Sequence, residues 1–135
     1  KKNTLLGITE YQPWGHYECL DMYRLNNWIL KKAGGNWHTP PSKEAILNVN
    51  ADSKIQKYIK RHKKELWGWK DPRTCLTIEL FLPFIENVHF ICNFRDTEEV
   101  AKSLVKRDGF DHQKALDLAK EYNKRILSIL SRYGN

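Results

Sequence analysis

Long hydrophobic runs are absent from this sequence of 135 residues. The longest apolar stretches, Ile78–Ile85 and Val88–Cys92, are interrupted by Glu79, Pro83 and His89. Both fall far short of the ~20 residues that span a bilayer, so no membrane-spanning helix is expected. The first residues also lack the apolar core of ~7–15 residues that a secretory signal peptide needs.

Cysteine is scarce as well, with three residues at positions 19, 75 and 92. An odd number of widely spaced cysteines inside periodic apolar segments favours buried thiols over a disulfide framework. We therefore expect a cytoplasmic protein. The five histidines show no metal-ligand spacing, so no metal site is expected.

Glycine and proline are few, 7 and 5, while hydrophobic residues make up 41% of the chain. This composition is typical of a globular protein, and the length predicts one domain over residues 1–135. The sequence shows neither repeats nor a linker, and it leaves the oligomeric state open.

The net charge of +7 comes mostly from one segment without acidic residues. Six basic residues gather there: Lys54, Lys57, Lys60, Arg61, Lys63 and Lys64. Between them, Ile55, Tyr58, Ile59 and His62 recur at helical spacing, which predicts an amphipathic helix over 52–65. A solvated lysine face explains the charge best. An anionic partner is the alternative, and nucleic acid is the less favoured partner.

Apolar periodicity and capping residues predict four further helices. They span residues 17–33, 73–81, 96–107 and 111–132. Asp71-Pro72 marks the start of the second, which should end near Pro83, and Asp96 opens a capping box for the third. Gly34-Gly35 and Gly109 supply helix stops, and residues 37–50 are expected to form a connection.

Two segments are predicted to be strands, Leu66–Trp69 and Val88–Phe94, because they are rich in aromatic and β-branched residues. With the helix between them they would form a right-handed βαβ unit with parallel strands. The fold class expected is therefore α/β, with both strands ending on one rim. Lys70 and Arg73 follow the first strand, and Arg95 and Ser103 follow the second, a pattern that favours an anion such as phosphate or sulfate.

Three segments of this chain resemble the PAPS-dependent sulfotransferases, especially the bacterial and phage-like branch. They are Gly68–Arg73, Phe94–Asp96 with Ser103 eight residues after Arg95, and Leu104–Gly109. The resemblance runs from about Gly15 to Leu130. It implies a P-loop-kinase-like, three-layer α/β fold with a short parallel sheet and flanking helices.

The resemblance also implies roles for individual residues. Arg95 and Ser103 would bind the 3′-phosphate of PAPS, and Lys70 would lie near the transferred sulfuryl group. Glu18 would be the catalytic carboxylate, and we assign Arg73 to substrate binding. The implied reaction moves a sulfuryl group from PAPS to a hydroxyl or amine of a small-molecule or glycan acceptor.

One departure from the family pattern is that the sequence contains no Gly/Ser/Thr-rich loop for the 5′-phosphosulfate and no Gly-x-x-x-x-Gly-Lys. We therefore expect an internal, truncated fragment of a sulfotransferase, with half of the cofactor site and no activity by itself. The competing hypothesis is a non-catalytic anion or nucleic-acid binding domain that uses the lysine-rich helix, with Trp67 and Trp69 as stacking platforms. A relative of the P-loop kinases is a third possibility.

Overall fold

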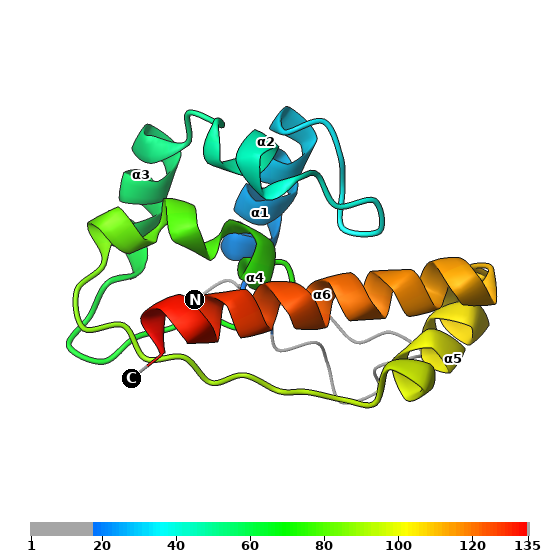
Figure 1. The fold of residues 1–135 in the computed structure, drawn as a ribbon. Coiled ribbons are helices and arrows are strands. Elements are labelled where there is room, and N and C mark those ends of the chain that lie inside the picture. The colour runs from blue at the N-terminus through cyan, green and yellow to red at the C-terminus, as the bar shows by residue number, and fades with distance from the viewer. Residues whose placement is uncertain (1–17, 135) are drawn as a thin grey trace. The chain divides into compact units, whose positions relative to one another are not determined.

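Helices are the only regular secondary structure that the computed structural model describes, and it describes residues 18–134. The chain divides into two compact units, Lys1–Glu86 and Asn87–Asn135. In the first unit the structure describes four α-helices and two 3-10 helices (Figure 1). They are α1 (Leu20–Lys32), α2 (Lys43–Leu47), α3 (Asp52–His62), α4 (Thr74–Thr77), η1 (Ile78–Leu80) and η2 (Leu82–Phe84).

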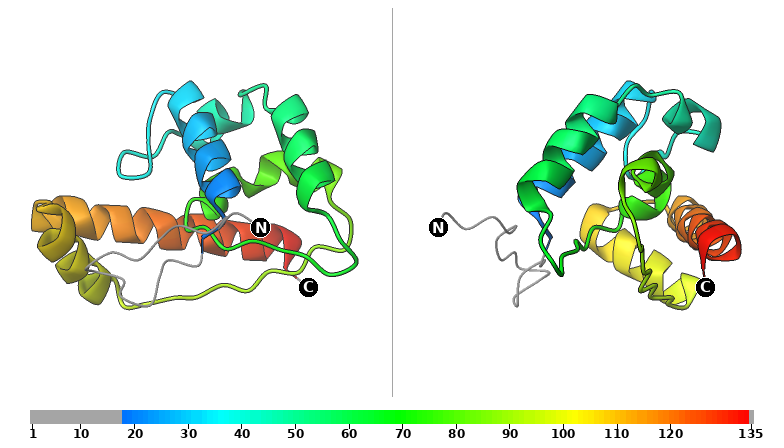
Figure 2. Two further views of the ribbon diagram at one scale, coloured as in Figure 1. Left: turned by 180° about the vertical axis from the view of Figure 1, so that it is seen from behind. Right: turned by 90° about the vertical axis from the view of Figure 1, so that its left-hand side faces the viewer.

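The helices α1 and α3 form as their apolar spacing predicts. Each buries one stripe of side chains, Met22, Leu25 and Ile29 on α1, and Ile55 and Ile59 on α3. The two helices lie side by side (Figure 2). The lysines of α3 remain exposed, which confirms the predicted amphipathic helix, although it ends at His62 rather than at residue 65.

The core of the first unit is closed by the short helices that follow α3. Phe81 is fully buried, as are Leu30 of α1 and Ile46 of α2. The helix α4 is shorter than predicted and continues as the two 3-10 helices, with Pro83 inside the second. The helix α2 lies within residues 37–50, for which the sequence predicts a connection rather than a helix. Ser42 begins it by accepting a hydrogen bond from the Ala45 N–H at 3.1 Å.

The second unit contains two helices, α5 (Thr97–Asp108) and α6 (His112–Tyr133), which confirm the last two predicted helices. The helix α5 packs against the N-terminal part of α6 (Figures 1 and 2). Asp96 caps α5 by accepting from the N–H groups of Glu98 and Glu99 at 3.0 and 3.1 Å. Gly109 ends it with φ of 66°, a left-handed conformation that glycine adopts without strain.

The predicted α/β fold is wrong for the part of the chain that the structure describes, which contains no strand and no sheet. Neither Leu66–Trp69 nor Val88–Phe94 is a strand, and the predicted βαβ unit is therefore absent there. A strand is defined by backbone hydrogen bonds to a neighbour, and residues 18–134 offer these segments no such partner. Leu66 and Ile91 are 92% and 95% exposed, so their apolar character does not reflect burial.

The three cysteines are half-buried free thiols.

Candidate functional site

The carboxylate of Glu18 lies between two cations that precede α4. Its Oε1 accepts a hydrogen bond from Nζ of Lys70 at 3.0 Å, and its Oε2 lies 3.6 Å from Nη1 of Arg73. Glu18 and Lys70 are 52 positions apart in the sequence. The first unit therefore brings together three of the five residues that were assigned to the site.

Asp71 holds the backbone and the side chain of Arg73 at the same time. Its Oδ1 accepts from the Arg73 backbone N–H at 2.8 Å and from Nη1 of Arg73 at 2.8 Å. Sequence reasoning gave Asp71 a role in beginning the helix. It missed the bond to the guanidinium, because nothing in the sequence shows that the Arg73 side chain folds back.

The Arg73 side chain is largely enclosed. Its Cζ lies 4.5 Å from the centroid of the Tyr23 ring, a cation–π contact, and only 13% of the side chain is exposed. Tyr23 was not predicted as part of the site, because an aromatic residue on a helix face is usually a core residue. These contacts favour Arg73 as the group that positions Glu18.

Two buried atoms of this cluster, Oδ2 of Asp71 and Nε of Arg73, have no hydrogen-bond partner among the described residues. A buried polar group without a partner costs about 1–3 kcal/mol, so such groups in a native protein call for an explanation.

The Glu18 side chain is only 8% exposed, whereas that of Lys70 is 60% exposed. Lys70 is therefore the member of the cluster that a ligand reaches from solvent.

The two tryptophans before Lys70 pack into the protein. The indole Nε1 of Trp69 donates to Oγ1 of Thr74 at 2.9 Å. Its ring centroid lies 5.6 Å from those of both Trp67 and Phe81, and 6.0 Å from that of Tyr58. Trp69 is half-buried, and its contacts with these three rings leave less of its surface for a nucleic-acid base to stack on.

Tyr58 joins α3 to the residue that precedes α1. Its hydroxyl donates to Sγ of Cys19 at 3.9 Å. Burial raises the pKa of the Tyr58 hydroxyl far above its ordinary value, and the neighbouring Cys19 raises it further. The hydroxyl therefore keeps its proton at physiological pH and can donate it to the Cys19 sulfur.

The second unit carries the two residues assigned to the 3′-phosphate. Arg95 directly precedes the cap of α5, Ser103 lies in its second turn, and both are exposed. An α-helix rises about 1.5 Å per residue and returns to the same face after seven positions. Ser103 therefore shares a face with Asp96, about 10 Å along the helix axis.

The N-terminus of α5 is less available to an anion than the sequence suggested. Asp96 occupies the N–H groups of Glu98 and Glu99, and Glu99 lies on the same helix face as Ser103. The assigned donors are thus the Arg95 guanidinium and the Ser103 hydroxyl rather than the helix backbone. Their convergence on one anion stays a prediction, although the strand from which it was argued is absent.

Lys70 was also predicted to share a rim with Arg95, because both were expected to end parallel strands. Those strands are absent, so the reason given for that rim no longer holds. Lys70 belongs to the first unit and Arg95 to the second. Their juxtaposition remains a prediction.

Within residues 18–134, no three His, Cys, Asp or Glu side chains are grouped as a metal site would require. In the same residues, no helix combines the length and the apolar composition needed to cross a bilayer.

Comparison with known proteins adds no family to this geometry: no protein-family model matches the chain, and no curated protein and no solved structure is significantly similar to it.

Proposed function

We propose that the chain carries part of the site of a sulfotransferase that moves a sulfuryl group from PAPS to a hydroxyl or amine acceptor. The observation that supports this proposal is the contact of Glu18 with Lys70 and Arg73. The resemblance to sulfotransferases assigned a catalytic carboxylate to residue 18 and a cation to residue 70. Their side chains meet at 3.0 Å across 52 positions of sequence.

PAPS supplies the sulfuryl group, whose sulfur is attacked by the acceptor oxygen or nitrogen while the bond to the 5′-phosphate breaks. Such transfers have a loose, in-line transition state, so positioning and stabilisation of developing charge account for most of the catalysis. Lys70 suits the second task because its side chain is 60% exposed and carries a positive charge. Glu18 would take the proton of an acceptor that has reached Lys70, and Arg73, itself held by Asp71, lies 3.6 Å from the Glu18 carboxylate.

The residues present offer donors to both ends of PAPS. Lys70 of the first unit is the donor that the resemblance assigns to the sulfuryl group, and Arg95 and Ser103 of the second unit are the donors that it assigns to the 3′-phosphate. The 5′-phosphosulfate loop of the family has no counterpart in the sequence. We therefore expect weak binding, on the order of millimolar, where binding supplies only about 4 kcal/mol.

Calorimetric titrations with PAPS and with adenosine 3′,5′-bisphosphate test the proposal, because the two nucleotides differ only in the sulfuryl group. Lys70→Ala should remove any preference for PAPS over the bisphosphate. Arg95→Ala should weaken both by about tenfold, the loss expected for one charge-assisted hydrogen bond. Lys64→Ala is the matched control, since Lys64 is also exposed and the charge change is the same.

Three outcomes would contradict the proposal. If neither nucleotide binds, the chain does not carry the proposed cofactor site. An equal effect of Lys70→Ala on both nucleotides would separate Lys70 from the sulfuryl group. An equal effect of Lys64→Ala and Arg95→Ala would show that the nucleotides bind only through general electrostatic attraction.

Binding of nucleic acid by the lysine-rich helix is the second candidate. The exposed lysines of α3 support it, but Trp69, one of the two proposed stacking platforms, is half-buried against other aromatic rings. We therefore place sulfuryl transfer first.

A further inference from the structure

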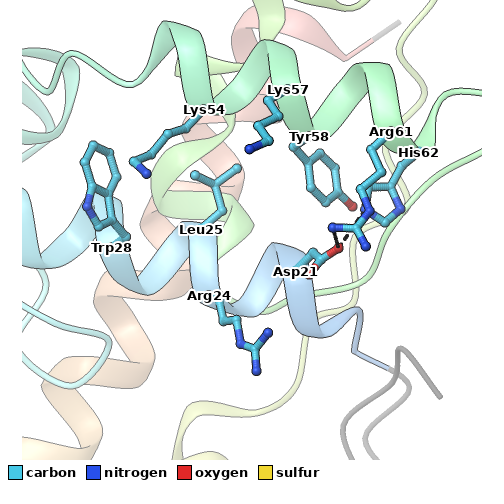
Figure 3. A pocket seen from close by; sticks show the side chains of 9 residues that line it. All are labelled: Asp21, Arg24, Leu25, Trp28, Lys54, Lys57, Tyr58, Arg61 and His62. Carbon is cyan, nitrogen blue, oxygen red and sulfur yellow. Dashed lines mark hydrogen bonds and ion pairs between the residues drawn. The ribbon is translucent and has the colours of Figure 1, made fainter. Parts of the chain in front are cut away.

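A pocket of about 380 Å³ opens between α1 and α3, and it contains none of the residues assigned to sulfuryl transfer (Figure 3). Its volume lies in the range of small-molecule sites, roughly 300–1,000 Å³. Nine residues line it: Asp21, Arg24, Leu25, Trp28, Lys54, Lys57, Tyr58, Arg61 and His62. Both helices are set by their buried stripes, so the pocket walls are part of a packed scaffold.

The pocket has an apolar interior with an aromatic ring on either side. Leu25 lies between the two helices, with Trp28 on one side of it and Tyr58 on the other (Figure 3). Leu25 and Tyr58 are buried, and Trp28 is half-buried. A flat or apolar ligand body is the natural occupant of such a space.

Asp21 is the only acidic residue among the described residues that line the pocket, and it already has cationic partners. Oδ2 of Asp21 lies 3.3 Å from Nη1 of Arg61 and 3.1 Å from Nε2 of His62. His62 in turn stacks on the Tyr58 ring, with centroids 4.4 Å apart. The negative charge of Asp21 is therefore held at one end of the pocket and does not repel an anion at the other.

The remaining cations of the pocket have no carboxylate partner among the described residues. These are Lys54 and Lys57 on α3 and Arg24 on α1. Nζ of Lys54 lies 4.9 Å from the centroid of the Trp28 ring, which holds the ammonium group at the apolar end of the pocket. Figure 3 shows Lys54 and Lys57 directed toward the space between the helices, while Arg24 extends away from α3.

We propose that the groove between α1 and α3 binds a small ligand that carries a phosphate or sulfate group on an aromatic body. Lys54 and Lys57 would bind the oxyanion, and the part of the pocket lined by Trp28, Leu25 and Tyr58 would hold the ring. The proposal is independent of the proposed function, because the pocket and the cluster around Glu18 share no residue.

A titration of the full chain with phenyl phosphate, followed by ¹H–¹⁵N NMR, tests the proposal. The readout is the indole N–H signal of Trp28, assigned by its loss in Trp28→Phe. We expect this signal to shift on addition of phenyl phosphate. Inorganic phosphate and cyclohexyl phosphate should bind at least about threefold more weakly, because they lack the aromatic ring. Phenyl sulfate replaces phenyl phosphate in a parallel titration and shows which oxyanion the groove prefers.

Two charge-matched double variants locate the binding site. Lys54→Gln with Lys57→Gln should raise the dissociation constant by about tenfold or more. Lys63→Gln with Lys64→Gln removes the same charge from exposed positions next to α3 that do not line the pocket, and should change it less than about twofold. All four lysines are exposed, so neither variant is expected to disturb the fold.

The proposal is overturned if the Trp28 signal does not move, if both double variants weaken binding equally, or if phenyl phosphate binds no better than inorganic phosphate. A single-stranded oligonucleotide that binds more tightly than phenyl phosphate, and that both double variants weaken equally, would assign the whole basic segment to nucleic acid. That result would also overturn the small-molecule pocket.

Discussion

Thr77 donates its hydroxyl hydrogen to Oδ1 of Asn26 at 2.7 Å, and both side chains are almost completely buried. The two residues are 51 positions apart, on α1 and α4. Nδ2 of the same amide approaches Oγ1 of Thr74 at 3.4 Å. One side chain of α1 thus fixes the position of the helix that follows Arg73.

Asn26→Ala should therefore lower the free energy of unfolding by about 1–3 kcal/mol, because the buried Thr77 hydroxyl loses its shortest hydrogen bond. Urea denaturation measures this change. Asn27→Ala is the control, since Asn27 is half-buried and no hydrogen bond of its side chain is present in the described residues. It should cost less than about 1 kcal/mol. A loss no larger for Asn26→Ala than for Asn27→Ala would contradict the assigned role.

The raised pKa of the Tyr58 hydroxyl predicts that the folded chain loses stability at alkaline pH. Burial raises the pKa of its hydroxyl above the unfolded value of about 10, so the unfolded chain loses this proton first. The contribution to stability is complete below pH 10 and falls as the pH rises further. Denaturation midpoints between pH 8 and 11 should show a steeper fall for the native chain than for Tyr58→Phe. Tyr133→Phe, at an exposed position, should keep the native slope.

The cap at Asp96 should stabilise α5. Asp96→Ala removes both hydrogen bonds at the N-terminus of the helix and should cost about 1 kcal/mol. Asp96→Asn keeps an acceptor oxygen and should cost only a few tenths of that amount. Hydrogen exchange of the α5 amides reports the difference. Equal protection in both variants would show that the cap does not hold the helix.

If the proposed function is correct, replacing Lys70 should change the kinetics of sulfuryl transfer. In the intact enzyme, Lys70→Ala should lower kcat more than it raises the KM for PAPS, because the ammonium group acts on charge that develops in the transition state. Lys64→Ala, with the same change of charge, should leave both constants unchanged. Native activity in Lys70→Ala would remove this residue from the mechanism.

The helices were predictable from the sequence because their information is local. The stripe of Met22, Leu25 and Ile29 and the cap at Asp96 act within a few turns of one helix. The short helix α2 escaped prediction, since five residues are too few to establish a period. The start of the helix after Asp71 was predicted correctly. Its length was not, because the α-helix gives way to two 3-10 helices, the second of which contains Pro83.

The strands were not predictable in the same way. Val88–Phe94 has the composition of a strand, but pairing depends on a neighbour that composition cannot reveal. The family resemblance named Glu18 and Lys70 one by one, but it did not predict that their side chains form an ion pair. The roles of Tyr23 and Asp71 could not be predicted, because they depend on how the Arg73 side chain folds back in three dimensions.

The connection between α5 and α6 has only three residues, 109–111, so these helices meet by closing a very short loop. In the first unit, by contrast, the contact of Asn26 with Thr77 closes a loop of 51 positions. Loop-closure entropy and folding time both grow with this separation. We therefore expect the helical hairpin of the second unit to assemble early during folding, before α4 docks on α1.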